Sequence, residues 1–537
     1  MKKLLILLAF SGIFFASCSN DDNAPNDQGP SEPTPTNYTS GSADFSTYVA
    51  VGNSLTAGYS DGALFMDGQL ASFPNMLATS FAEVGGGSFD QPLMADNLGS
   101  LTLGGNLLPG FENRYILSFA NVDPNDPNSV PSPMRLEVTG TTEVSNLLGG
   151  PFNNMGVPGA KIYHLAAEGY GSLDALAIGA ANPYYVRFAS SPSATIIGDA
   201  VAQNPTFFSL WIGSNDILSF AISGGNGVDR TGDPNAAAYG SNDITDPGLF
   251  HLVYEQLLQT LTANGATGAV ANLVDVTKVP YFTTVPYAPL DPTNPDFAPQ
   301  IPALNATFSQ LNQVFTFLGV PERSIEFATD AASALVIKDE SLEDLSAQIT
   351  STLMAFGVDA GTAGVVGFLY GQARQANEND LIVLSARNEI AEINETAFAT
   401  LQGLGLPAAD AGQLSVNGIT YPMEDQWVLT PDEQMLITAA TDNYNASINS
   451  LAQQYGLALV DIKNLLNTVS TDGITLNNGS TVTAQFAVGG AFSLDGIHLS
   501  PRGYAIVANE FIKAIEETYD AELPKVDPLQ YTGLYIN

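Results

Sequence analysis

Two short motifs at opposite ends of the chain contain the residue types of a serine hydrolase. Residues Gly52–Leu55 place Ser54 in a turn, and residues Asp495–His498 place a carboxylate three positions before an imidazole. A serine hydroxyl becomes a useful nucleophile when a base takes its proton, and that base needs a third group to hold its ring. Serine, histidine and a carboxylate together meet this need, so the motifs favour nucleophilic catalysis.

An apolar strand is predicted just before each of two glycine-containing turns. Residues 47–51 are mostly apolar and lead into the turn of Ser54, which is typical of a strand that bends sharply into a helix. Such a bend exposes the serine hydroxyl beside the positive end of the helix. Residues 207–212 repeat the pattern and end at Gly213–Asp216. Both turns are therefore candidate edges of one site.

Helices alternate with strands through the rest of the chain. A helix is predicted over 252–261 and a strand over 269–276, and Thr430–Glu433 has the form of a capping box that begins a helix ending at Gly456. A strand over 457–462 follows. Alternation of this kind predicts an α/β fold, a three-layer α/β/α sandwich around a mostly parallel sheet, in which sites form at the carboxyl ends of strands. Ser500 and Pro501 then have the form of an N-cap and first residue of a closing helix.

Large insertions separate these units. Apolar spacing predicts helices over 304–318 and 342–356, and a glycine-rich apolar stretch covers 361–371. We interpret about 300–425 as an inserted helical subdomain that covers the site, and plain core packing within one larger domain is the alternative. The Gly-, Asn- and Pro-rich stretch 60–150 predicts long loops.

Four ordered blocks resemble those of the GDSL/SGNH family of serine esterases and lipases. They are Gly52–Leu55, Asn154–Gly159, Gly213–Asp216 and Asp495–His498, and they occur in the family's order. Compound motifs in the right order are far more specific than any one of them alone. The resemblance implies an SGNH-like sandwich and a lipase or acylhydrolase activity.

The resemblance also implies a role for each site residue. Ser54 would attack the ester carbonyl, His498 would accept and return the proton, and Asp495 would orient His498. The amides of Ser54 and Gly159 and the side chain of Asn215 would form the oxyanion hole, where preorganised donors stabilise developing charge.

Some residues depart from this pattern or lie outside it. Asn53 stands where the family's name-giving motif has aspartate, and Gly156 is an alternative to Gly159 as the second oxyanion donor. His164 and His251 are interpreted as incidental, because neither has metal-ligand spacing. We therefore predict no metal and no cofactor.

The N-terminus predicts export and lipidation. Residues 1–17 comprise a basic start, an apolar run and a small-residue cleavage site, as in a secretory signal peptide. The only cysteine, Cys18, follows directly and resembles the acylated cysteine of a bacterial lipobox. An ordinary signal peptide with an incidental thiol is the alternative.

The segments that follow Cys18 predict a tethered envelope enzyme. Residues 19–22 resemble the acidic export signal of Bacteroidetes-type lipoproteins, which implies an outer-membrane lipoprotein exposed at the cell surface. Residues 18–43 are too polar to order themselves and predict a tether. We expect the hydrolase domain over 44–525 and a C-terminal tail over 526–537.

Composition narrows the classes of partner. Hydrophobic residues make up 45% and charged residues 13%, as in a folded protein, and the net charge is −39. Repulsion from phosphate excludes nucleic acid as a partner, and it disfavours electrostatic adhesion to anionic lipids, which leaves the lipid anchor as the membrane contact. We expect hydrolysis of a lipid or other acyl ester. The alternatives are removal of acetyl groups from a glycan and, in another class, a non-catalytic surface-binding lipoprotein.

Overall fold

The computed structural model describes residues 37–119, 122 and 131–536. The chain from Tyr38 onward forms one compact unit. No helix within the described ranges is both long and apolar enough to cross a membrane. The expected signal peptide and the lipidated Cys18 lie outside the described residues, so export and anchoring stay predictions from the sequence.

The centre of the unit is a five-stranded sheet in which every neighbouring pair is parallel. Numbered by their order in the chain, its strands run 2-1-3-4-5 across the sheet, which is the doubly wound arrangement with a topological switch beside the first strand. The α/β class with a parallel sheet is confirmed. The strands are β1 (Tyr48–Gly52), β7 (Asn154–Gly156), β8 (Phe207–Trp211), β9 (Thr267–Ala271) and β14 (Ala458–Val460).

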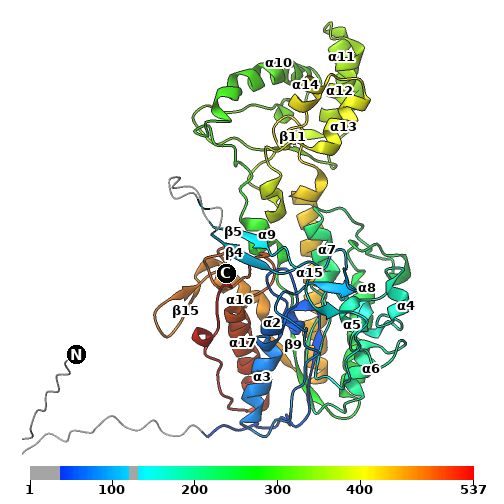
Figure 1. The fold of residues 1–537 in the computed structure, drawn as a ribbon, viewed down its shortest axis with the longest axis vertical. Helices are drawn as coiled ribbons and strands as arrows, with labels where there is room; N and C mark the ends of the chain where they lie inside the picture. The colour runs from blue at the N-terminus through cyan, green and yellow to red at the C-terminus, as the bar shows by residue number, and fades with distance from the viewer. Residues whose placement is uncertain (1–36, 120–121, 123–130, 537) are drawn as a thin grey trace, which may run out of the picture. The chain divides into compact units, whose positions relative to one another are not determined.

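Helices cover both faces of this sheet (Figure 1). Alternate side chains of a strand point to opposite faces, and on one face Trp211 of β8 meets Phe73 of α3, which stacks on Phe511 of α17 with ring centroids 4.6 Å apart. On the other face α6 contacts β1, and α15 contacts β9 and β14. The helices of these two layers are α3 (Phe73–Ala82), α6 (Ile196–Val201), α8 (Pro247–Thr262), α15 (Pro431–Tyr455) and α17 (Pro501–Tyr519).

The predicted helix ends are confirmed where a capping residue marks them. At the start of α15, Thr430 and Glu433 form a reciprocal capping box, and Gly456 ends the helix in the left-handed region. At the start of α17, the Ser500 hydroxyl accepts a hydrogen bond from the Gly503 amide. These residues satisfy backbone groups that have no partner inside the helix.

Two strands are shorter than predicted. The strand expected over 269–276 is β9, which starts at Thr267 and ends at Ala271, and Val276 lies in a 3-10 turn. The strand expected over 457–462 ends at Val460, because Asp461 caps the next helix, α16 (Ile462–Thr471). In both places apolar residues continue past the end of the strand, so the sequence pattern predicts a strand that is too long.

The prediction of long loops over 60–150 is wrong for part of that stretch. It contains the ten-residue helix α3, whose buried side chains include Phe73, Met76, Leu77 and Phe81. Their spacing of three, one and four is helical, and a proline occupies the first turn. The surrounding glycines and prolines masked this signal. The stretch also holds α2 (Met66–Leu70) and the short strands β2 (Leu101–Leu103), β3 (Asn106–Leu107), β4 (Tyr115–Ser118), β5 (Ser132–Arg135) and β6 (Thr142–Glu143).

The insertion combines helices with strands, whereas the sequence predicted helices. Its helices are α10 (Ile301–Phe317), α11 (Ser346–Ala355), α12 (Ala360–Tyr370), α13 (Glu395–Gly403) and α14 (Ala408–Gln413). Two antiparallel pairs join them, namely β10 (Val336–Lys338) with β11 (Ala373–Gln375) and β12 (Leu381–Ile382) with β13 (Val428–Leu429). The buried side chains of the insertion are continuous with the core around the sheet.

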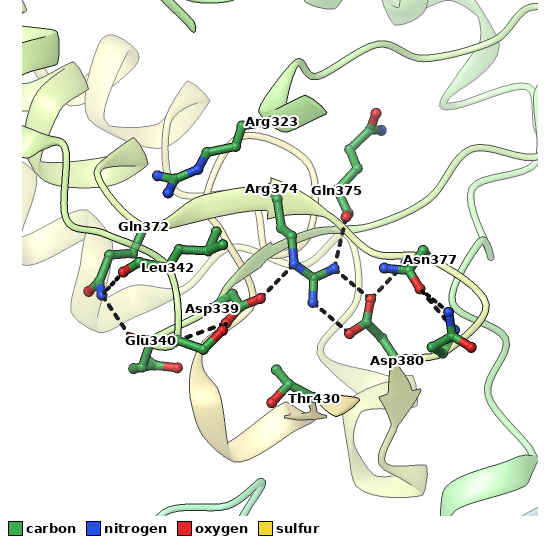
Figure 2. Close-up of polar contacts among 12 residues, drawn as sticks. Arg323, Asp339, Glu340, Leu342, Gln372, Arg374, Gln375, Asn377, Asp380 and Thr430 are labelled. Atoms are coloured by element: carbon green, nitrogen blue, oxygen red, sulfur yellow. Dashed lines mark hydrogen bonds and ion pairs between the residues drawn. The ribbon is translucent and has the colours of Figure 1, made fainter. Parts of the chain in front are cut away.

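A buried ion cluster holds the β10–β11 region together. Figure 2 shows Arg374 between two carboxylates, with Nε donating to Asp339 at 2.6 Å and both terminal nitrogens donating to Asp380 at 2.6 and 2.7 Å. Although burial opposes its charge, these carboxylates hold the pKa of the Arg374 guanidinium above its usual range. The cluster fixes the base of the insertion.

Both ends of the compact unit pack further than the sequence predicts. Thr39, placed in the tether, forms a β-bridge with Glu522. In the expected tail, the backbone of Thr532 accepts a hydrogen bond from the Arg502 amide at the start of α17, and the ring of Tyr535 packs on Phe65.

The remaining short helices and strands connect these parts. They are α1 (Ser54–Ala57), α4 (Leu173–Leu176), α5 (Pro183–Val186), α7 (Asn215–Ile222), α9 (Pro280–Thr283), β15 (Ile474–Thr475) and β16 (Thr481–Val482).

Candidate active site

The structure brings Ser54, His498 and Asp495 into one hydrogen-bonded chain. His498 Nε2 lies 2.9 Å from the Ser54 hydroxyl, and His498 Nδ1 lies 2.8 Å from Asp495 Oδ2. Ser54 and His498 are 444 positions apart in the sequence. All three side chains are largely shielded from solvent, and the ring of Tyr59 packs 4.5 Å from the imidazole. The arrangement can pass a proton from the hydroxyl to the imidazole.

The turn that carries Ser54 depends on a glycine before it. A side chain at Gly52 would approach the Trp211 carbonyl to 2.4 Å and the Thr56 hydroxyl to 2.2 Å. Ser54 then begins α1 at the end of β1. The first amide of a helix has no partner inside the helix, and within the described residues the Ser54 amide has none outside it. This amide is free to bind an anion.

Asn53, which stands where the GDSL motif has aspartate, has a structural role in the turn. Its side-chain oxygen accepts a hydrogen bond from the Leu55 amide at 3.1 Å and so caps α1. An amide oxygen serves this capping role as a carboxylate oxygen does. The Asn53 Nδ2 is buried and has no hydrogen-bond partner among the described residues.

Asp495 is held by hydrogen bonds from both sides. Its Oδ1 accepts from the Ser493 hydroxyl and from the amides of Ile497 and His498, and its Oδ2 accepts from the Gly62 amide as well as from His498. Burial opposes ionisation, but the adjacent His498 and these donors outweigh it and hold the pKa of Asp495 well below its usual range. The carboxylate is therefore ionised and fixed in orientation.

A second buried carboxylate, Asp61, supports the loop of Asp495, and the sequence analysis missed it. Asp61 Oδ1 accepts from the Leu494 amide at 2.8 Å, and the Asp61 amide donates to Ser493. Burial raises the pKa of Asp61 to about 7, although Arg114 lies 3.7 Å from Oδ2. No motif surrounds Asp61, so only the fold reveals its place.

The predicted oxyanion donors follow three adjacent strands at one edge of the sheet. Gly52 of β1 is paired with Gly156 of β7 and with Trp211 of β8, so Ser54, Gly159 and Asn215 all emerge just beyond this row. The carboxyl ends of parallel strands on either side of the switch form the usual crevice for ligands. The fold thus gathers these predicted donors at the crevice beside Ser54.

Gly159 fits the donor role better than Gly156. The Gly156 amide donates to the Asn154 side chain at 3.0 Å, and a side chain at Gly156 would approach the Ala57 amide to 2.3 Å. Gly159 is exposed with a φ of +81°, and its amide has no partner among the described residues. Of the two glycines, Gly159 is therefore the one whose amide is available for the predicted donor role.

The turn of Gly159 is fixed on both sides. Asn215 Nδ2 donates to the Ala160 carbonyl at 2.9 Å, and Asn182 Nδ2 donates to the Pro158 carbonyl at 2.8 Å. Asp216 Oδ2 accepts from the Ile162 amide at 2.9 Å. Burial raises the pKa of Asp216 to about 6. Donors held in this way need little rearrangement when charge develops nearby.

An apolar cavity adjoins Ser54 and His498. Its wall includes Leu55, next to Ser54, together with Ile497 and Leu499 on either side of His498. The rest of the wall is apolar and comes mainly from α16 and α17, including Leu465, Leu466, Ile506 and Val507. An apolar group attached to the reacting carbonyl could lie here without losing hydrogen bonds.

The other two histidines have no catalytic neighbours. His164 Nδ1 accepts from the Lys161 amide and its ring stacks on Tyr170, and burial lowers the pKa of His164 to about 4. His251 is exposed on α8. Across the described ranges, no group of three or more His, Cys, Asp or Glu residues is arranged to hold a metal ion.

No protein-family model, curated protein or solved structure matches this chain. Functional inference therefore depends on the residues and geometry of the site.

Proposed function

We propose that the protein hydrolyses carboxylic esters through an acyl-enzyme formed on Ser54. The observation that carries this proposal is the continuous hydrogen-bonded chain from Ser54 through His498 to Asp495, next to amides that have no other partner. A buried structural serine would not need an oriented imidazole beside it. A non-catalytic binding protein would have no use for the whole arrangement.

In the first half of the reaction, Ser54 Oγ attacks the ester carbonyl while its proton passes to His498 Nε2. The resulting imidazolium is stabilised by Asp495 through Nδ1. Collapse of the tetrahedral intermediate breaks the bond to the alcohol, which takes the proton from Nε2. The acyl group remains on Ser54 as an ester.

In the second half, water attacks this acyl-enzyme and His498 accepts the water proton. The tetrahedral intermediate then releases the carboxylic acid, and the proton returns to Ser54 Oγ. In both halves the oxyanion is bound by the amides of Ser54 and Gly159 and by the side chain of Asn215. Because the fold holds these donors in place before charge develops, they need little rearrangement during the reaction.

We also propose that the domain has the SGNH-type three-layer sandwich. The 2-1-3-4-5 strand order and the helices on both faces support this architecture. The position of all four sequence blocks at the site or in the turns beside it supports the family resemblance. The insertion would then be an addition to that sandwich, and it reaches the site because Ser385 Oγ lies 2.8 Å from the Tyr281 hydroxyl beside the catalytic loop.

The apolar cavity favours a substrate with an extended apolar acyl group. The cavity has a volume of about 70 Å³, which takes the first few carbons of an acyl chain, and each CH₂ group buried there contributes about 0.8 kcal/mol. We therefore place acyl or lipid esters before acetylated glycans. Attachment through Cys18 would hold the enzyme at the cell surface, and release of a Cys18→Ala variant from membranes would test that part.

The test is turnover of acetyl, octanoyl and palmitoyl esters by residues 38–537. We expect longer chains to be preferred, and Ser54→Ala to lower turnover at least about a thousandfold without lowering the melting temperature. Leu466→Trp, which fills the cavity, should reduce turnover of long chains and spare the acetyl ester. Turnover restricted to acetyl esters would favour glycan deacetylation. Turnover that survives in Ser54→Ala would contradict the proposal.

A further inference from the structure

The outer helices of the insertion are almost free of charge. The helices α10, α11 and α12 contain no Asp, Glu, Lys or Arg, although 13% of the chain is charged. Within 345–373 the only charged residue is Asp359, whose carboxylate caps α12 by accepting from the Gly361 and Thr362 amides. A surface helix in a strongly acidic protein normally carries charges on its solvent face, so this composition needs another explanation.

These same helices expose large aromatic side chains. Phe317 is 70% exposed, Phe356 is 45% exposed and Phe368 is 59% exposed, and they are three of the four exposed phenylalanines among the described residues. The rings of Phe317 and Phe356 lie 6.1 Å apart in an edge-on pair, and Met354, two positions before Phe356, is also exposed. We call Phe317, Met354, Phe356 and Phe368 the apolar tip.

The apolar tip differs from the other exposed apolar side chains. Ile178 and Val488 are even more exposed, but each is an aliphatic side chain in a turn and belongs to no pair of exposed rings, which is ordinary for a protein surface. In the apolar tip, two rings touch and the supporting helices offer no ionic side chains. In Figure 1, α11 and α12 lie at the end of the insertion farthest from the sheet. Adjacent exposed apolar groups of this kind mark a contact surface.

We propose that the apolar tip docks on an electrically neutral lipid surface. The net charge of −39 would be repelled by anionic head groups, whereas a charge-free surface can approach zwitterionic head groups without that penalty. Exposed phenylalanine side chains on a helix are suited to burial at the boundary between head groups and acyl chains. Phenylalanine and methionine also occur in protein interfaces, but the residues that anchor such interfaces are mainly Trp, Tyr and Arg, and the apolar tip contains none of these three.

This docking is independent of chemistry at Ser54. It brings the insertion to a membrane through apolar contact, as a second attachment besides any acyl group on Cys18. One apolar attachment alone gives reversible binding, and two together give stable residence. The tip residues make no contact with the catalytic residues, so substitutions there leave hydrolysis of a soluble ester unchanged.

The experiment measures flotation of residues 38–537, which lack Cys18, with phosphatidylcholine vesicles. We expect the protein to float with the vesicles. The partition coefficient of the double variant Phe317→Ser/Phe356→Ser should be lower by a factor of about ten or more. The matched control is Ile178→Ser/Val488→Ser, which removes two exposed apolar side chains elsewhere and should float as the parent does. Equal melting temperatures establish that the variants are folded.

Three results of the vesicle experiment would overturn the docking proposal. They are absence of the parent protein from the floated fraction, an equal loss in the control variant, and flotation that requires anionic lipid. Dimerisation of the parent in solution that is lost in the tip variant, without vesicle binding, would assign the surface to a second copy of the chain and would also overturn it. Hydrolysis of a soluble acetyl ester, measured on the same samples, tests Ser54 separately, so the two proposals can fail independently.

Discussion

Two buried carboxylate clusters in this molecule use similar residues for different ends. In the insertion, Asp339 and Asp380 surround Arg374. At the edge of the sheet, Asp495 holds His498, with Asp61 behind the same loop. Both clusters are largely buried and rich in hydrogen bonds, yet among the described residues only the second adjoins groups that have no partner.

The difference lies in what each cluster leaves unsatisfied. In the insertion, every carboxylate oxygen has a donor and the guanidinium is occupied by the two acids and a backbone carbonyl. At the sheet edge, both oxygens of Asp495 have donors, but Asp61 Oδ2 has none among the described residues, and the chain ends on the Ser54 hydroxyl and on free amides. A closed network stabilises a fold, whereas an open one is prepared for a substrate. The comparison therefore predicts that variants of the two clusters affect different measurements.

The largest effect on stability is expected from Arg374→Met. Removing the guanidinium leaves two buried carboxylates without a counter-charge, which costs about 3–5 kcal/mol of unfolding free energy. Ester turnover per folded molecule should change little, because the cluster does not touch the site. Urea denaturation and turnover, measured on one preparation, check both parts. If Arg374→Met lowered turnover without lowering the free energy of unfolding, the claim that this cluster serves stability and not activity would be wrong.

The converse effect is expected from Asn215→Ala. Loss of one oxyanion donor should lower kcat by about 10²–10³ with a much smaller change in KM. The matched control is Asn445→Ala, which removes a buried amide that bonds only the backbone of Leu273 and should cost stability rather than kcat. A change confined to KM in Asn215→Ala, or an equal fall in kcat in the control, would contradict the oxyanion role.

The smallest effect is expected from Asp61→Asn, and it depends on pH. The pKa of Asp61 is raised to about 7 in the folded protein, so the folded state keeps a proton that the unfolded state releases above about pH 4. The unfolded state then binds fewer protons, and the unfolding free energy falls as pH rises towards 7. Asn keeps the acceptor for Leu494 and removes this titration.

The measurement for Asp61 is the difference in unfolding free energy between Asp61→Asn and the parent, at pH 5 and pH 7. We expect the variant to gain stability relative to the parent as pH rises. A difference that is the same at both pH values would show that the titration of Asp61 does not contribute to stability.

The catalytic blocks could be predicted because their residues are local and their order is specific. The turn at Ser54 and the Asp495–His498 pair each carry their own signal within a few residues. The sheet followed from strands that alternate with capped helices. That Ser54 and His498 act together across 444 positions was predicted only through the family resemblance. The structure supplies the distance between the His498 Nε2 and the Ser54 hydroxyl.

The supporting residues could not be predicted in the same way. Asp61 is a single acid in a glycine-rich stretch, and it becomes important only because the chain returns at Leu494. Arg374 likewise meets Asp339 across a strand pair that the helical interpretation of the insertion did not include. The helix α3 did have a detectable apolar spacing, which the neighbouring glycines and prolines obscured. Long-range contacts leave no local pattern, so sequence reasoning misses the residues that depend on them.

The central claim, that His498 activates Ser54 as a nucleophile, is tested most directly by a fluorophosphonate that reacts only with an activated serine. Residues 38–537 are treated with the reagent, digested, and the modified peptide is located by mass spectrometry, with His498→Ala as the matched control. We predict one adduct, on Ser54, and almost none in the control because the base that takes the proton is absent. No adduct on Ser54, or equal labelling in His498→Ala, would contradict the account.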